Sequence, residues 1–295
     1  MKKLRLFSTV ILICSAVLFG YCIVRQWKND EKVPPVIKMD QTSIEVSVKD
    51  GDDALLKGVT ATDKKDGDVT DSLIVDNISD FLDDGSRFVT IAAIDSNNNV
   101  AKAVRQITYS DYEHPKFDFT ESMRFVEGET DYLDNVTAED SIDGDLSGTV
   151  NFSDNTQITV DKAGTYKAEL QVRNSLGDTE YLPFTLEVLK AEDYNKEPSI
   201  HLKHFVKYIK KGKTIDYKNN LDYVYIGSRK YKLVDGDKIE NTTVGRDRIH
   251  VNDDNVKYNT PGVYEVEYSM TLNDEMKEDQ ETIRGTVRLV VVVEE

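Results

Sequence analysis

The stretch VTATDKKDGDV, residues 59–69, decides the fold class because the chain contains it twice. It returns 77 residues later as VTAEDSIDGDL, residues 136–146, and a glycine precedes each copy at the same spacing, Gly51 and Gly128. Self-similarity at a fixed period is the sequence signature of a repeat architecture. The acidic turn therefore marks a structural unit that is built more than once.

A segment with alternating apolar residues follows each acidic turn. The first begins after Gly85 and runs to Asp95, and the second begins after Gly164 and runs to Asn174. A divergent third copy keeps Asp-Gly-Asp in VDGDKI, residues 234–239, and has its own alternating segment in NTPGVYEVEYSMTLND. Alternation of period two predicts half-buried strands.

The repeats predict an all-β chain of three tandem immunoglobulin-like β-sandwich domains, because short strands with turns at regular intervals are typical of that architecture. Both cysteines precede residue 23, so the repeats have neither a disulfide framework nor a thiolate zinc site. The expected domains are residues 35–110, residues 114–190 and a divergent third domain, residues 197–295.

These motifs resemble the bacterial surface Ig-like repeats of pesticidal crystal proteins and Gram-positive envelope proteins. That family has a V-T-A-x-D-x-x-D-G-D-V turn, then a G-x-Y-x-V-x-Y strand. Residues 59–69 and 136–146 match the turn, and Gly164 and Tyr166 match the strand, whereas Arg87 stands where the family has tyrosine. The resemblance covers most of residues 35–189. It implies a β-sandwich, an extracellular setting and a role in display or adhesion.

The N-terminus predicts a membrane anchor. Residues 6–24 carry no charge, and 19 helical residues at about 1.5 Å each are close to the hydrocarbon thickness of a bilayer. The run is longer than the apolar region of a cleaved signal peptide. We therefore expect a cytoplasmic tail at 1–5, a single-pass signal anchor at 6–24 and a linker at 25–34. Lys and Arg are balanced across the span, so the extracellular placement of residues 25–295 rests on the short tail and on the resemblance.

Two interpretations of the acidic turns remain open. Calcium takes six to eight oxygen ligands in irregular geometry, and each turn offers three carboxylates. Alternatively, each turn is an exposed loop whose aspartates bond neighbouring N–H groups. Calcium is the only cofactor that the sequence suggests. The candidate ligands are Asp63, Asp66 and Asp68 in the first repeat, and Asp140, Asp143 and Asp145 in the second. In the third repeat, alignment on Asp-Gly-Asp places Lys232 at the position of Asp63, which would spoil an equivalent site.

Composition and motifs narrow the class of function. The chain has 54 acidic against 37 basic residues and a net charge of −17, which disfavours nucleic acid as a partner. A polar loop repeated in tandem lacks the cleft and opposed environments of a catalytic carboxylate pair. No nucleophile elbow, phosphate loop or zinc-protease helix occurs in the sequence. We therefore expect a chain that is not an enzyme.

The resulting hypothesis is a membrane-anchored surface protein that displays Ig-like domains for adhesion or for interaction with a surface protein or glycan. The divergent third repeat, with its long segment 223–237, is the expected interaction surface. Two alternatives remain: a passive stalk or envelope scaffold, and an accessory subunit of a surface enzyme or secretion complex.

Overall fold

The computed structural model describes residues 2–29, 32–82, 84–154, 156, 162–273 and 282–295. Residue 1 of the expected tail and residues 30–31 of the expected linker lie outside this set. Helix α1 (Lys2–Asn29) comes first, and the strands that follow form six sheets in the described residues. The strand-rich architecture predicted from the repeats is therefore confirmed.

Spatial contacts divide the chain into two compact units, residues 1–112 and residues 113–295. After α1, the first unit contains one pair of sheets, the first sheet pair, ordered β1-β3-β4 and β2-β7-β6-β5. Its elements are β1 (Val36–Met39), β2 (Ser43–Val46), α2 (Asp52–Leu55), β3 (Val59–Asp63), β4 (Gly67–Asp68), the 3₁₀ turn Thr70–Ser72, β5 (Ile74–Ile78), β6 (Arg87–Ile94) and β7 (Val100–Tyr109).

The second unit contains two further sheet pairs. The second sheet pair is ordered β11-β10-β8 and β12-β13-β14-β9. It consists of β8 (Lys116–Phe119), β9 (Arg124–Val126), β10 (Val136–Asp140), β11 (Gly144–Asp145), the 3₁₀ turn Ser147–Thr149, β12 (Asn151–Phe152), β13 (Gly164–Arg173) and β14 (Thr179–Leu189), and helix α3 (Ala191–Tyr194) follows it.

The third sheet pair is ordered β15-β17-β18-β20-β19 and β16-β23-β22-β21. It has a larger first sheet than the other two pairs. Its elements are β15 (Ser199–Leu202), β16 (Val206–Lys210), the 3₁₀ turn Lys218–Asn220, β17 (Leu221–Ile226), β18 (Arg229–Val234), β19 (Ile239–Glu240), β20 (Thr243–Gly245), the 3₁₀ turn Arg246–Arg248, β21 (Ile249–Asn252), β22 (Gly262–Asn273) and β23 (Thr282–Glu294).

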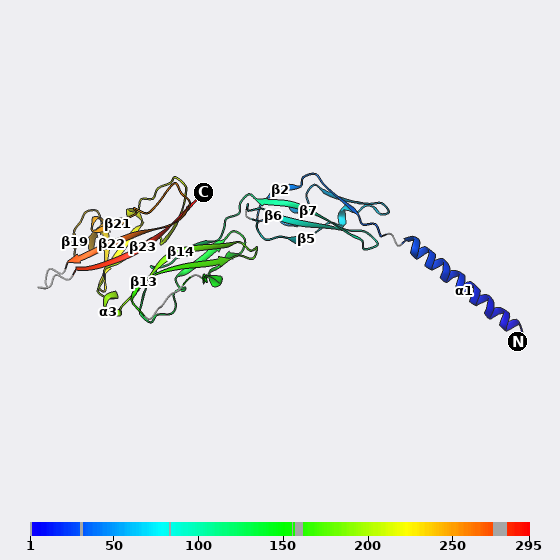
Figure 1. The fold of residues 1–295 in the computed structure, drawn as a ribbon, viewed down its shortest axis with the longest axis horizontal. Helices are drawn as coiled ribbons and strands as arrows, with labels where there is room; N and C mark the ends of the chain where they lie inside the picture. Colours follow the sequence, from blue (N-terminus) through cyan, green and yellow to red (C-terminus); the bar gives the residue numbers. More distant parts are fainter. Residues whose placement is uncertain (1, 30–31, 83, 155, 157–161, 274–281) are drawn as a thin grey trace. The chain divides into compact units, whose positions relative to one another are not determined.

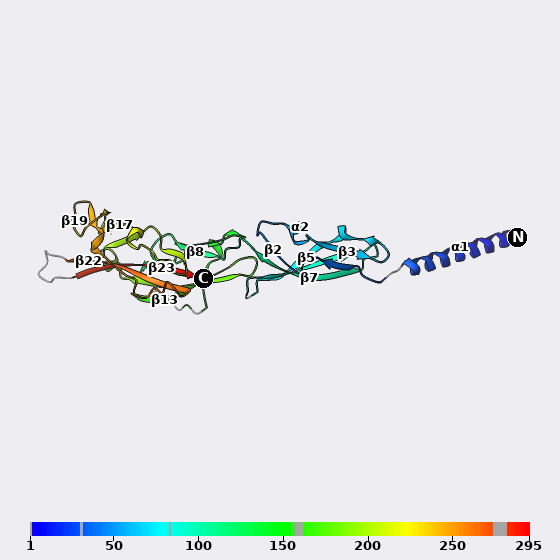
Figure 2. The ribbon, with the colours of Figure 1, turned by 90° about the horizontal axis from the view of Figure 1, so that it is seen from above.

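The three sheet pairs share one connectivity. In each, the second strand pairs in parallel with the last strand: β2 with β7, β9 with β14 and β16 with β23. The last two long strands of each pair form an antiparallel hairpin, which Figures 1 and 2 show for β22 and β23. This shared connectivity is the structural counterpart of the sequence repeat, and it lets equivalent positions be compared between sheet pairs.

Alternation along β3 explains how the acidic turn is placed. Val59, Ala61 and Asp63 point to the buried side of the strand, whereas Thr60 and Thr62 are exposed, because successive side chains of a strand face opposite ways. Val59 packs in the core of the first sheet pair. Asp63 is thus the last inward-facing residue of β3, and its carboxylate is buried at the point where the acidic loop begins.

The second unit has one continuous hydrophobic core. Buried residues of the second sheet pair, such as Phe184 and Leu186, belong to the same cluster as Leu202, Tyr268 and Leu289 of the third. Contiguous apolar burial on this scale is the main favourable term in folding. We infer that the second and third sheet pairs stabilise one another.

Arg87 replaces a tyrosine that the other two sheet pairs retain. Tyr166 and Tyr264 each donate a hydroxyl hydrogen bond to a backbone carbonyl four residues upstream, at 2.7 Å and 2.9 Å. Arg87 stands at the equivalent position of β6, where its Nε donates to the carbonyl of Ser79 at 2.6 Å and its guanidinium lies over the ring of Phe81. A different donor therefore fastens the start of the long strand in the first sheet pair.

Helix α1 contains the segment 6–24. Within the residues that the structure describes, no helix combines the length and the apolar character that a membrane crossing requires.

Candidate functional site

The acidic loop of the first sheet pair, residues 63–68, is a turn shaped by its own first aspartate. Asp63 Oδ1 accepts hydrogen bonds from the backbone N–H groups of Lys65 and Asp66, at 2.7 Å and 2.9 Å. Gly67 has φ +77°, a conformation that glycine adopts without steric cost. The exposed-loop interpretation therefore accounts for one oxygen of Asp63.

Three carboxylates converge beside this turn. Asp63, Asp66 and Asp95 each offer one oxygen, and the three oxygens lie within 4.8 Å of one another. Asp95 comes from the turn between β6 and β7, so the cluster joins a loop of one sheet to a loop of the other. The sequence motif predicts Asp63, Asp66 and Asp68 as the three ligands, whereas the structure brings Asp95 to the first two in place of Asp68.

Asp66 and Asp95, like Asp63, are held in place by hydrogen-bond donors. Asp66 accepts hydrogen bonds from Ser96 N and Ser96 Oγ, both at 2.9 Å, and these bonds lower its pKa. Asp95 Oδ1 accepts from the backbone of Asn97 at 2.8 Å and of Asn99 at 2.7 Å. Burial raises the pKa of Asp95, but hydrogen bonds from Asn99 and Asn97 outweigh it, so that pKa lies below its usual value.

Asp63 differs from these two acids in having an oxygen without a donor. Its side chain is buried, with 7% of the residue exposed. Among the described residues, no group hydrogen-bonds to Asp63 Oδ2. The ammonium of Lys65 lies nearby and donates to Asn97 Oδ1 at 3.0 Å.

The second sheet pair repeats this loop with one change. Asp140 Oδ1 accepts from the backbone N–H groups of Ile142 and Asp143. Asp143 accepts from Ser175, as Asp66 does from Ser96. The counterpart of Asp95 is Asn174, whose Oδ1 accepts from the turn that follows it.

In the second loop, Asn174 bonds the oxygen whose counterpart is unpaired in the first loop. Asn174 Nδ2 donates to Asp140 Oδ2 at 2.7 Å, and Asp140 Oδ2 is the counterpart of Asp63 Oδ2. An aspartate at position 95 has no such N–H to offer. The two loops therefore share a backbone design but differ in the group that faces the first aspartate.

Asp68 and Asp145, the third acids of the two predicted sets, have local roles. Each caps the 3₁₀ turn that follows: Asp68 Oδ1 accepts from Thr70 N at 2.9 Å, and Asp145 Oδ1 accepts from Ser147 N at 2.9 Å. Hydrogen bonds from Thr70 and Ser147 lower the pKa of Asp68 and Asp145 respectively. Neither carboxylate belongs to the convergent groups in the described residues.

The predicted equivalence of Lys232 with Asp63 is wrong. Val36 is the first residue of β1, and Asp63 directly follows the residue that pairs with it. Ser199 is the first residue of β15, and Ile226 directly follows the residue that pairs with it. Ile226 therefore occupies the position of Asp63. Lys232 lies farther on, in β18. Asp235 and Asp237 form a separate exposed turn. Sequence alignment failed here because the hairpin β17–β18 is longer than β3–β4.

A second acidic group lies in the second sheet pair. His114 Nδ1 is 2.8 Å from Asp178 Oδ2 and 3.6 Å from Glu180 Oε1. Burial raises the pKa of Glu180. The His114 side chain is 59% exposed, so this group has the properties of a surface ion pair.

The outer face of β15, β17 and β18 in the third sheet pair carries a set of aromatic and cationic side chains, here called the aromatic face: His201, Tyr223, Tyr225, Lys230 and Lys232. The His201 ring stacks on Tyr223 with centroids 4.3 Å apart, and Tyr225 meets Tyr223 edge-on at 5.6 Å. Lys230 Nζ lies 3.3 Å from the Tyr223 ring centroid. Cross-strand register places Tyr225 opposite Lys230 and Tyr223 opposite Lys232.

Charge on the aromatic face is mixed. Burial lowers the pKa of His201, Lys230 lowers it further, and Glu121 and Asp222 act in the opposite direction. Burial also raises the pKa of Tyr223. The face is thus a set of mutually packed aromatic rings with charges of both signs beside it.

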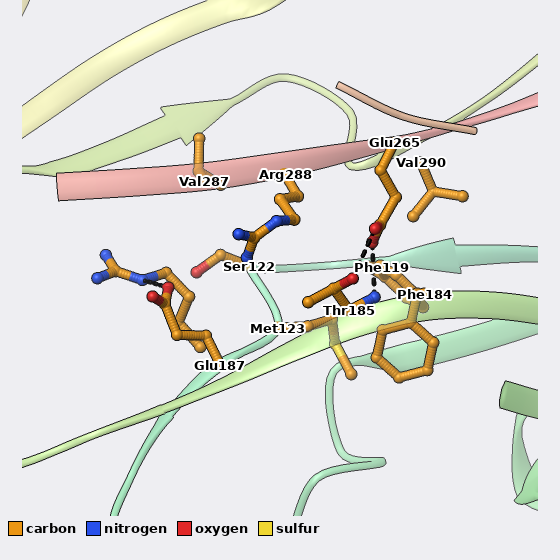
Figure 3. Close-up of a pocket in the computed structure, with 11 residues that line it drawn as sticks. Phe119, Ser122, Met123, Phe184, Thr185, Glu187, Glu265, Val287, Arg288 and Val290 are labelled. Atoms are coloured by element: carbon orange, nitrogen blue, oxygen red, sulfur yellow. Dashed lines mark hydrogen bonds and ion pairs between the residues drawn. The ribbon is translucent and has the colours of Figure 1, made fainter. Parts of the chain in front are cut away.

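The seam between β14 of the second sheet pair and β22 of the third is tightly packed. Figure 3 shows Glu265 of β22 reaching Thr185 of β14, whose N and Oγ1 donate to it at 2.6 Å and 2.5 Å. Arg124 binds both Glu187, at 2.8 Å, and Glu197. The cavity at this seam measures about 10 Å³, roughly the space that one water needs. This seam is therefore an internal contact with no room for a ligand, whereas a larger cavity of about 520 Å³ lies where β8 and β10 face Val206 and Tyr208 of β16.

Comparison with known proteins does not assign the chain to a family. No family model and no curated protein matches it. Similar solved structures include CBM51-2 with INT domains from Clostridium perfringens ZmpB (15% identity, TM-score 0.21, 88% of this chain and 44% of that one). Human CDH23 EC21-23 (14%, 0.23, 88% and 100%) and domains 6-7 of surface layer protein SbsC (12%, 0.18, 54% and 99%) also match. The chain spans less than half the length of the two ZmpB structures it matches.

Proposed function

We propose that this chain is a non-catalytic extracellular protein that binds a protein or glycan ligand through the aromatic face of its third sheet pair. In this proposal each sheet pair is one immunoglobulin-like domain. The 19 uncharged residues at 6–24 favour attachment to a bacterial cell membrane with the sheets outside.

The aromatic face carries the proposal. Tyrosine supplies a large contact area with few rotatable bonds, and it is enriched at the centres of interfaces. Tyr223 and Tyr225 remain partly exposed on a sheet, where neighbouring rings and Lys230 hold them in fixed orientations. Holding the contact side chains before binding reduces the entropy lost on association. A ligand would therefore meet a preformed surface.

Replacing Tyr223 and Tyr225 together with alanine is expected to weaken ligand binding at least tenfold, about 1.4 kcal/mol, because truncated aromatic anchors typically cost this much or more. The full-length chain and the double variant would be compared on immobilised panels of glycans and of purified extracellular proteins. Any ligand found is then titrated by surface plasmon resonance.

A matched control is Tyr181→Ala. Tyr181 is an exposed tyrosine on β14 of the second sheet pair, so its removal tests for nonspecific loss of aromatic surface. Binding that survives in the double variant, or that falls equally in Tyr181→Ala, would reject the aromatic face as the binding surface. Fractionation of cells tests the membrane attachment separately.

A further inference from the structure

We propose that the acidic loop of the first sheet pair is a calcium site, with Asp63, Asp66 and Asp95 as its carboxylate ligands, and that the matching loop of the second sheet pair is not. This proposal does not depend on the ligand bound at the aromatic face. It concerns a different sheet pair and a different chemistry.

The unpaired oxygen of Asp63 is the first observation. A buried polar atom without a partner is costly, and in native proteins such atoms normally have a protein, water or ion partner. Asp63 is 93% buried, by its exposure of 7%, and its Oδ2 receives no hydrogen bond from the described residues. Asp66 and Asp95 each place an oxygen within 4.8 Å of an oxygen of Asp63. Three such charges repel one another, and a cation between them would relieve that repulsion.

The second sheet pair provides an internal comparison. There, Asn174 takes the place of Asp95, and its amide satisfies the first aspartate through a 2.7 Å hydrogen bond. The two loops thus share one backbone design. In the second loop an amide N–H bonds the first aspartate, whereas the first loop has a carboxylate at that place and no such donor. Position 95 is the place where the first loop exchanges a hydrogen-bond donor for another oxygen ligand.

The third sheet pair completes the comparison. Its counterparts of Asp63 and Asp95 are Ile226, by register in the first sheet, and Leu272, ten residues after Gly262 as Asp95 is ten residues after Gly85. Both are partly buried and pack against the hydrophobic core. At these two facing positions the chain therefore has two acids in the first sheet pair, an acid and an amide in the second, and two apolar residues in the third. Of the three combinations, the pair of acids is the one that offers a cation two carboxylates.

The ligand set favours calcium among divalent cations. All three side chains offer oxygen, the donor that calcium prefers, and the site contains no histidine or cysteine that would favour zinc. The three carboxylates fill only part of a shell of six to eight ligands. Asp66 is exposed, so water can supply the rest. Magnesium requires a near-ideal octahedron, which a loop held by backbone turns is less able to adopt.

Lys65 is the competing source of positive charge. Its charge lowers the pKa of Asp66 and of Asp95, after larger effects of hydrogen bonding and burial. Its ammonium donates to Asn97 Oδ1, however, and no hydrogen bond reaches Asp63 Oδ2. Lys65 thus places a positive charge near the cluster, while Asp63 Oδ2 receives no hydrogen bond from the described residues.

Calcium added to the full-length chain is expected to bind with measurable heat and to slow amide hydrogen exchange in residues 63–68 and 95–99. Asp95→Asn should recreate the arrangement of the second loop, because Nδ2 can donate to Asp63 Oδ2. We therefore expect this variant to lose at least about tenfold in calcium affinity and to show slowed exchange even in chelator.

Asp71→Asn is the matched control, because it removes the same charge from an exposed residue near the loop that is outside the cluster. It should bind calcium as the natural chain does. The proposal is overturned if calcium produces neither heat nor slower exchange in the natural chain, since Lys65 or a shared proton then neutralises the cluster. It is also overturned if Asp95→Asn retains full affinity.

Discussion

Arg105→Met is expected to lower the free energy of unfolding of the first sheet pair by about 3 kcal/mol, because one buried and two partly buried carbonyls would lose their donor. Arg105 is 1% exposed and lies on the inner face of β7. Its Nη1 donates to the carbonyls of Leu55 and Lys57 at 2.8 Å and 2.9 Å, and its Nη2 donates to that of Gln41 at 2.8 Å.

This buried guanidinium holds two loops to the sheet. Burial lowers the pKa of Arg105, and the charge of Asp40 opposes that shift; arginine nevertheless stays protonated in proteins. The equivalent residues of the other sheet pairs, by register, are Phe184 and Leu289. The first sheet pair thus uses a cation where the others use apolar packing, and methionine would restore the packing without the donors.

Hydrogen exchange of amides in β6 and β7 measures this loss within the first unit. Lys102→Met is the control: it removes a cation from the same strand, but Lys102 is an exposed partner of Asp76 at 2.8 Å. Exposed ion pairs contribute between zero and about 1 kcal/mol. Equal effects of the two substitutions would show that the three hydrogen bonds of the Arg105 guanidinium do not stabilise the first sheet pair.

Gly285→Ala is expected to destabilise the third sheet pair by about 3 kcal/mol, because it forces a backbone apart in a packed region. A Cβ at Gly285 would lie 1.8 Å from the carbonyl oxygen of Pro198. Both residues are buried. Pro198 directly precedes β15. Because Gly285 of β23 has no side chain, the backbone at Pro198 can pass close over β23 where the third sheet pair begins.

Thermal unfolding and hydrogen exchange in β15 and β23 would measure this effect. Gly148→Ala provides a matched substitution, since a Cβ there would meet no atom within 4 Å. It should change stability by less than about 1 kcal/mol. A Gly285→Ala chain that is as stable as Gly148→Ala would show that Pro198 can move away at little cost.

The repeated acidic turn predicts much of the fold because it recurs with the strands around it. Val59 to Asp63 form a strand as the alternation predicts, and so do Val136 to Asp140. The aligned positions 95 and 174 were visible in the sequence as Asp against Asn. Their importance was not, because the turn that carries them comes from the opposite sheet and only folding brings it to the acidic loop.

Other features depend on tertiary contacts that sequence patterns do not encode. Arg105 falls in a polar-looking strand, and nothing in its spacing indicates three carbonyl partners from distant loops. Lys232 was misaligned because matching Asp-Gly-Asp letters outweighed strand register. The segment 223–237, which the sequence predicts as an interaction surface, contains both tyrosines of the aromatic face, and its role in binding stays a prediction.

Counting calcium ions bound per chain at saturation tests most directly whether the side chain at one structural position decides the chemistry of the repeated loop. Equilibrium dialysis of the full-length chain, at a free calcium concentration just sufficient to saturate the natural sequence, should give about one ion for that sequence and about half an ion or less for Asp95→Asn. Asn174→Asp, which gives the second loop the acids of the first, should give two. A natural chain that binds no calcium, or one whose bound ion is unchanged by Asp95→Asn, would contradict this account of the acidic loops.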